Sequence, residues 1–104
     1  AHYQGKVRNA EFWLTQLIGR FGQAQLVAVP EDALKAARLK HGDAHANWEW
    51  WTAANGASFH NLDQAKESLA RSVTASQEGI KILDDAIKAK QAAGPTTAAA
   101  PAPK

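Results

Sequence analysis

The chain has 104 residues, a formal net charge of +2 from mixed acidic and basic side chains, and no cysteine. This length suits a single domain, and without cysteine the chain forms no disulfide, no thiolate metal site and no covalent haem linkage through a C-x-x-C-H motif. The dispersed charges argue against a basic nucleic-acid-binding surface, and no apolar run approaches the roughly 20 residues that cross a bilayer.

The first predicted helix covers about residues 3–21, because apolar side chains recur there at alternating three- and four-residue spacing. This seam consists of Tyr3, Val7, Ala10, Leu14, Leu17 and Phe21. Phe12 and Trp13 lie off the seam, which indicates that the helix meets more than one neighbour. We expect residues 22–29 to form a connector.

A second helix is predicted over residues 31–56. Pro30 suits a helix start, and Glu31 and Asp32 favour the positive end of the helix dipole. Its seam consists of Leu34, Ala37, His41, Ala44, Trp48, Trp51 and Asn55. We expect the pair Gly42-Asp43 to kink the helix or to divide it into two.

The third predicted helix covers residues 62–93, with Asn61 as its N-cap and Gln64 in the reciprocal capping position. Its seam consists of Leu69, Val73, Ser76, Ile80, Leu83 and Ile87. Gly94-Pro95 is a typical helix end. Residues 95–104 contain mainly Ala, Pro and Thr, so we expect a flexible tail after a helical domain of residues 1–94.

The predicted fold is therefore all-α, with long antiparallel helices. They form either a three-helix bundle or an extended helical hairpin with a third helix docked on it. Several seam positions hold alanine, serine or histidine, which bury little apolar surface. We therefore expect modest stability in isolation and a partner that supplies the missing burial.

Three tryptophans near the end of the second helix cover two of its faces. Trp48 and Trp51 lie about 60° apart around the helix, whereas Trp50 lies about 160° from their midpoint. One interpretation is core packing on one side and a partly exposed tryptophan on the other. The alternative is a second buried face against another subunit or a cofactor.

Histidines could bind a metal at two places in the chain, one with a pair of histidines and one with a single histidine. His41 and His45 lie one helical turn apart, a spacing that lets two imidazoles share an ion; ordinary polar or interface roles are the alternative. His60, beside Phe59 and just before the third helix, could present one ring nitrogen outwards while the other is held. That arrangement suits an axial haem ligand, and a simple helix-boundary hydrogen bond is the alternative.

Residues 45–50 (HANWEW) and 53–61 (AANGASFHN) resemble the C-terminal helical region of multihaem c-type cytochromes. The similarity is to the pentahaem, ammonia-forming cytochrome c nitrite reductases and their octahaem relatives. This chain departs from the family pattern in three ways: Leu62 replaces a proline, Ser58 replaces a glycine, and the haem-binding cysteines are missing.

The resemblance implies that His60 is an axial ligand of a haem c attached outside this chain. Phe59, Trp48 and Trp51 would pack near that haem. It also implies a periplasmic or otherwise extracytoplasmic location, a homodimer through the long helices, and the remainder of a multihaem cytochrome as partner. Electron transfer and nitrite reduction would belong to the whole protein, with no catalytic group here. The alternative is a stand-alone helical interaction module that oligomerises through its tryptophan faces without a cofactor.

Overall fold

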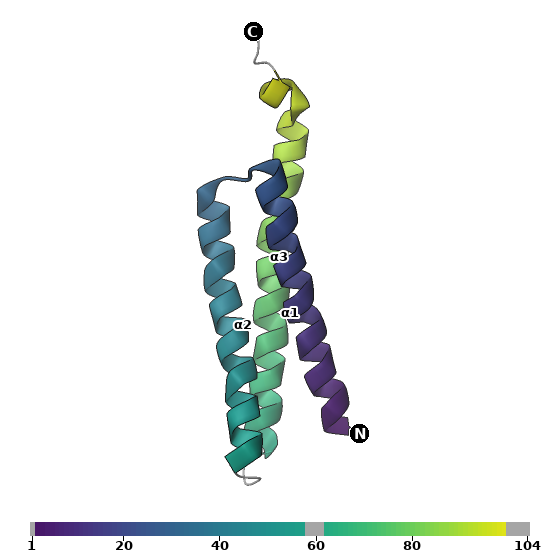
Figure 1. The fold of residues 1–104 in the computed structure, drawn as a ribbon, viewed down its shortest axis with the longest axis vertical. Coiled ribbons are helices and arrows are strands. Elements are labelled where there is room, and N and C mark those ends of the chain that lie inside the picture. The colour runs from purple at the N-terminus through teal and green to yellow at the C-terminus, as the bar shows by residue number, and fades with distance from the viewer. Residues whose placement is uncertain (1, 58–61, 100–104) are drawn as a thin grey trace.

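A computed structural model describes the backbone of residues 2–57 and 62–99, and side chains over residues 5–50, 64 and 66–93. It contains three α-helices, α1 (His2–Val27), α2 (Glu31–Ala57) and α3 (Leu62–Ala99) (Figure 1). No strand occurs in these described ranges. The predicted all-α class is confirmed.

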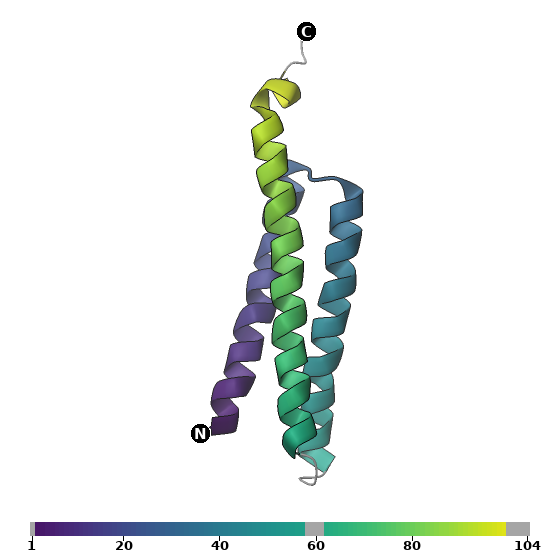
Figure 2. The same ribbon diagram turned by 180° about the vertical axis from the view of Figure 1, so that it is seen from behind.

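The longest helix, α3, lies against both of the others, whereas α1 and α2 touch each other little (Figures 1 and 2). Consecutive helices run antiparallel, as predicted. The bundle extends over 64 × 22 × 15 Å, and its radius of gyration is 17.4 Å. A compact domain of this length would have a radius of about 13 Å. The molecule is therefore a thin rod with α3 as its shared element.

The core follows the predicted seams and is largest near the α1–α2 connection. Its main cluster of buried residues comprises Leu17, Ala24, Val29, Ala37, Ile80 and Leu83. Two smaller clusters lie further along the rod, one around Ala10 and Leu69 and one around Leu14, Ala44 and Ala75. Alanine contributes almost half of the buried apolar positions, so each helix pair approaches closely but buries little area.

The predicted end of the first helix at Phe21 is wrong, because α1 continues to Val27. Ala24 extends the seam by one step and is fully buried, which favours another helical turn over a connector. The Ala28 amide donates to the Gln25 carbonyl, and the Val29 amide donates to the Ala24 carbonyl, both at 3.1 Å. With Ala28 at a φ of 59°, this pair of bonds forms a Schellman cap.

The second helix is continuous through Gly42-Asp43, so the expected division into two helices is wrong. A Cβ at Gly42 would meet nothing within 4 Å, so no neighbour forces a break there. A single exposed glycine costs a helix about 1 kcal/mol, which the flanking helix tolerates. Pro30 directly precedes α2, and its carbonyl accepts a 3.3 Å hydrogen bond from the Leu34 amide.

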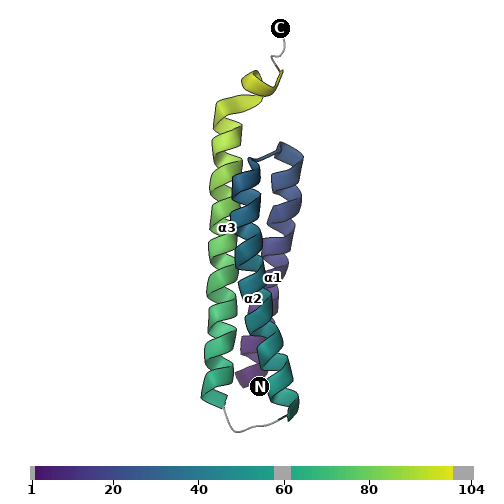
Figure 3. The same ribbon diagram turned by 90° about the vertical axis from the view of Figure 1, so that its left-hand side faces the viewer.

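The third helix passes the expected stop at Gly94-Pro95 and ends at Ala99. Proline lacks an amide donor and crowds the preceding turn, so it can bend a helix instead of ending it. Figure 3 shows the last turns of α3 leaving its main axis and extending beyond the α1–α2 connection. Side chains from Lys88 to Ala93 are all exposed. Residues 100–104 of the predicted tail lie outside the described residues.

Small polar residues bring α2 and α3 together. Ser68, Ser72 and Ser76 recur every four residues along α3, and all three are buried. The Ser72 hydroxyl donates to the Ala44 carbonyl at 2.7 Å, and the Ser68 hydroxyl donates to the Asn47 carbonyl at 2.8 Å. Such bonds fix the register of the two helices, and short side chains at this spacing allow their backbones to approach closely.

Candidate functional site

The predicted haem-ligating segment joins α2 to α3. Phe59 and His60 lie outside the described residues, as does Asn61, the expected N-cap. The side chain of Trp51 is also outside the described set, although its backbone belongs to α2. The predicted roles of these residues in cofactor binding therefore stay predictions.

The two described tryptophans of α2 occupy different environments. Trp48 is half-buried and packs against both small core clusters, where it links α2 to α1 and α3. Trp50 is 42% exposed. Within a single chain this matches the first sequence interpretation, in which one tryptophan packs in the core and another is partly exposed.

Four aromatic rings form a file along the α1-facing flank of α2. Phe21 meets His41 edge to face, with ring centroids 6.2 Å apart. His41 stacks with His45 at 6.0 Å and an interplanar angle of 18°, and His45 stacks with Trp48 at 6.5 Å. The structure thus brings together the two histidines that the sequence predicted as neighbours, and adds an aromatic group at each end.

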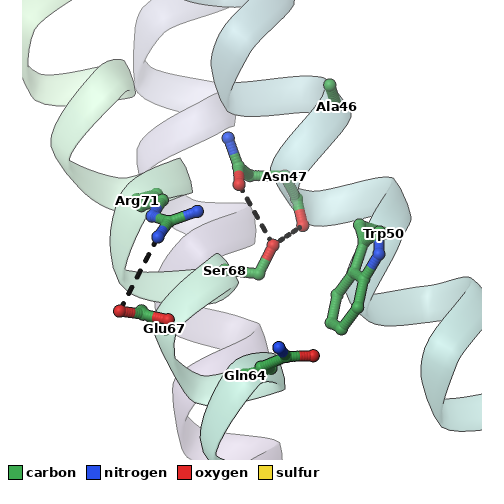
Figure 4. Close-up of a pocket in the computed structure, with 7 residues that line it drawn as sticks. All are labelled: Ala46, Asn47, Trp50, Gln64, Glu67, Ser68 and Arg71. Atoms are coloured by element: carbon green, nitrogen blue, oxygen red, sulfur yellow. Dashed lines mark hydrogen bonds and ion pairs between the residues drawn. The ribbon is translucent and has the colours of Figure 1, made fainter.

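A groove of about 430 Å³ lies between α2 and α3 on another side of the rod (Figure 4). Its lining residues are Ala46, Asn47, Trp50, Gln64, Glu67, Ser68 and Arg71. The Ser68 hydroxyl lies 3.1 Å from Asn47 Oδ1, and Asn47 Nδ2 donates to the Asp43 carbonyl. These bonds hold the Asn47 amide in one orientation, while the Trp50 indole flanks the groove.

Charges of both signs lie along this groove and its continuation towards Glu78. Arg71 lies 3.6 Å from Glu67, and Lys40 Nζ lies 2.8 Å from Glu78 Oε1. The hydrogen bond from Lys40 to Glu78 raises the pKa of Lys40 above its ordinary value of 10.5. In the groove itself the charges of Glu67 and Arg71 offset each other, whereas its continuation also contains the acidic side chains of Asp43 and Glu78.

The groove was not predicted from the sequence, because its walls come from two helices. The register of one helix against the other cannot be inferred from the sequence of either helix alone. The serines at positions 68, 72 and 76 were the available signal, since hydroxyl groups repeated every four residues on one helix face indicate close contact with a neighbour. Only Ser76 was placed on the predicted seam. The contribution of Asn47 had no sequence signal of its own.

Two further results concern the part of the chain that the structure describes. No cluster of three or more His, Cys, Asp or Glu side chains there could hold a metal ion. No helix in that part combines the length and apolar character needed to span a membrane, as predicted.

No protein-family model matches the chain, and no curated protein matches it. The fold defines the class of the protein, an elongated all-α bundle. The resemblance to multihaem cytochromes noted above consequently rests on the sequence of residues 45–50 and 53–61 alone.

Proposed function

We propose that this chain is the C-terminal helical part of a nitrite-reductase-like multihaem cytochrome c. The whole protein would be a periplasmic electron-transfer enzyme that reduces nitrite to ammonia. This part would supply His60 as one axial ligand to a haem c whose cysteine anchors lie outside the chain, and would perform no catalysis alone.

The observation that carries the proposal is the place of the motif at residues 53–61 in the chain: it begins in the last turns of α2 and directly precedes α3, which runs antiparallel to α2. Hydrogen bonds from Ser68 and Ser72 to the α2 backbone tie those helices together near this end of the rod. A haem ligand needs such support, because the ring must stay aligned with the iron while the covalent attachment is elsewhere. Trp48 reinforces the same end from the core.

The outer face of α1 supports the dimer in this proposal. Five exposed residues repeat there at three- and four-residue spacing: Phe12, Thr15, Gly19, Gly22 and Leu26. A Cβ at either glycine would meet nothing within 4 Å, so neither glycine is required by packing inside the chain. Phe12 is 51% exposed and Leu26 is 88% exposed. Glycines between two large apolar side chains suit close approach of another helix.

Addition of ferric haem to the 104-residue chain tests the ligand. We expect a shift of the haem Soret band that is lost in His60→Ala, because the iron would lose its nitrogen ligand. The matched control is His45→Ala, which removes an exposed histidine of α2 and should keep the shift.

Two results would contradict axial ligation by His60. One is no Soret shift with the unaltered chain, and the other is a shift of equal size with His60→Ala. Circular dichroism of each variant establishes that the helices are intact, so that loss of ligation can be separated from unfolding.

A second candidate function, a stand-alone interaction module without a cofactor, is favoured by the same exposed face of α1. This candidate predicts that the chain forms a stable oligomer in the absence of haem. It also predicts that His60→Ala leaves binding to a partner unchanged. Sedimentation of the chain alone tests this candidate, since a monomer without haem removes it, and the haem titration with His60→Ala distinguishes the two.

A further inference from the structure

The stacked imidazoles of His41 and His45 have a feature that the proposed function does not use. Both are on one face of α2, with ring centroids 6.0 Å apart and planes within 18° of parallel. In the described part of the chain, no hydrogen bond engages a ring nitrogen of His41, and the one polar contact of the His45 ring is with Glu49. Their nitrogens are therefore open to an external ligand.

Glu49 lies one further turn along the same face. Its Oε1 is 3.7 Å from Nδ1 of His45, and both side chains are at least half exposed. A carboxylate beside one ring nitrogen favours the tautomer with its proton there, which leaves Nε2 free to bind a metal. Trp48 stacks on the other side of His45, with ring centroids 6.5 Å apart.

We propose that His41 and His45 chelate one divalent transition-metal ion, with Glu49 as the carboxylate that orients His45. Imidazole nitrogens select Cu²⁺, Ni²⁺ and Zn²⁺ over Mg²⁺ and Ca²⁺, and the general affinity order places Cu²⁺ first. Water completes the coordination, because the described residues offer two imidazoles here and no third ligand. This inference is independent of the proposed haem function.

The geometry needs only rotation of the two side chains. Nitrogens that bind one ion at about 2.1 Å each lie at most about 4 Å apart. Two rings one helical turn apart can meet that limit without any change in the backbone. The bound ion would bridge the turn that contains Gly42, the weakest helix former in this part of α2, and so stabilise the helix there.

The test uses the 104-residue chain with His2→Ala and His60→Ala, which leaves His41 and His45 as its two histidines. Titration with Cu²⁺, Ni²⁺ and Zn²⁺ is followed by calorimetry and by the thermal midpoint. We expect one ion per chain and a rise in the midpoint. Glu49→Gln should weaken binding by about tenfold, the lower end of the effect of removing a ligand-orienting carboxylate.

The matched control moves one histidine by one position, as His45→Ala with Ala46→His. This variant keeps the composition, but the two imidazoles then lie about 140° apart around the helix and cannot share an ion. We expect its affinity to fall to that of His45→Ala alone. Equal affinity in the relocated variant, or no saturation at one ion per chain, would overturn the proposal. Circular dichroism of each variant before metal addition checks that α2 is formed.

Discussion

At the scale of single residues, two buried serines of α3 differ in how their hydroxyl groups are satisfied. Ser72 and Ser76 are both fully buried. The Ser72 hydroxyl donates to the Ala44 carbonyl at 2.7 Å. Ser76 Oγ has no hydrogen-bond partner among the described residues. A buried hydroxyl without a partner is unfavourable, whereas one with a good acceptor stabilises the fold.

Alanine at these two positions should therefore change stability in opposite directions. Ser72→Ala should lower the free energy of unfolding by about 1 kcal/mol, because an interhelical hydrogen bond is lost. Ser76→Ala should leave it unchanged or raise it by up to about 1 kcal/mol. Urea denaturation of the two variants measures the difference. Equal destabilisation by both would contradict this assignment of the hydroxyl groups.

Local sequence patterns predicted which apolar residues are buried but, apart from Ser76, not which polar ones are. Leu14, Leu17, Leu69 and Leu83 were on predicted seams and are buried, since three- and four-residue spacing directly encodes a helix face. The contact between Ser68 and Asn47 joins residues 21 positions apart. Its existence depends on the register of α2 against α3, which neither local pattern contains.

At the scale of helices, the cap of α1 has an unusual residue. Ala28 has a φ of 59°, a left-handed conformation in which glycine is the common choice. A side chain with a Cβ costs about 1 kcal/mol or more in that conformation. The cap is nonetheless formed, because Val29 inserts into the core beside Ala24 and the two capping bonds are satisfied.

Ala28→Gly should raise the free energy of unfolding by about 1 kcal/mol, because glycine adopts this conformation without steric strain. The matched control is Ala70→Gly, at an exposed position inside α3, which should lower it by about 1 kcal/mol. Thermal or urea denaturation measures both. A destabilised Ala28→Gly would show that the left-handed residue does not limit the stability of this cap.

The ends of the helices were harder to predict than their existence. Gly22 and the Gly94-Pro95 pair are both common stop signals, yet both helices continue past them. For α1 the decisive contribution is tertiary, since Ala24 and Val29 bury against α3. The helix propensities of single residues contain no information about such burial. Good helix formers after a stop signal, such as Ala98 and Ala99, also favour continuation.

At the scale of the whole molecule, substitutions on the outer face of α1 should change the stability of the chain and its self-association in opposite directions. Gly19→Ala and Gly22→Ala should each raise the thermal midpoint of the monomer, because nothing lies within 4 Å of the added methyl group. The same changes should weaken dimers that use this face, because a second helix could no longer approach as closely.

Gly42→Ala provides the control, since that glycine is also open but lies on α2. It should raise stability without changing self-association. Sedimentation equilibrium and thermal denaturation of the three variants separate the two effects. Unchanged dimerisation in Gly19→Ala and Gly22→Ala would exclude the outer face of α1 as the interface.

Of the candidate sites, the sequence predicted the His41 and His45 pair from its four-residue spacing, and the structure places the two rings together. The spacing could not predict that Phe21 of α1 would pack edge to face against His41, at one end of the row of aromatic rings. The prediction that His60 is a haem ligand came from family resemblance, which is information about a motif and not about packing.

The position of α3 between two helices that scarcely touch each other has a consequence for assembly. Because α1 contacts mainly α3, it can separate without breaking the hydrogen bonds that join α2 to α3. An equivalent helix from another chain can then occupy its place. Exchange of α1 between two molecules would convert the internal α1–α3 packing into an intertwined dimer, and would leave the α2–α3 hairpin intact.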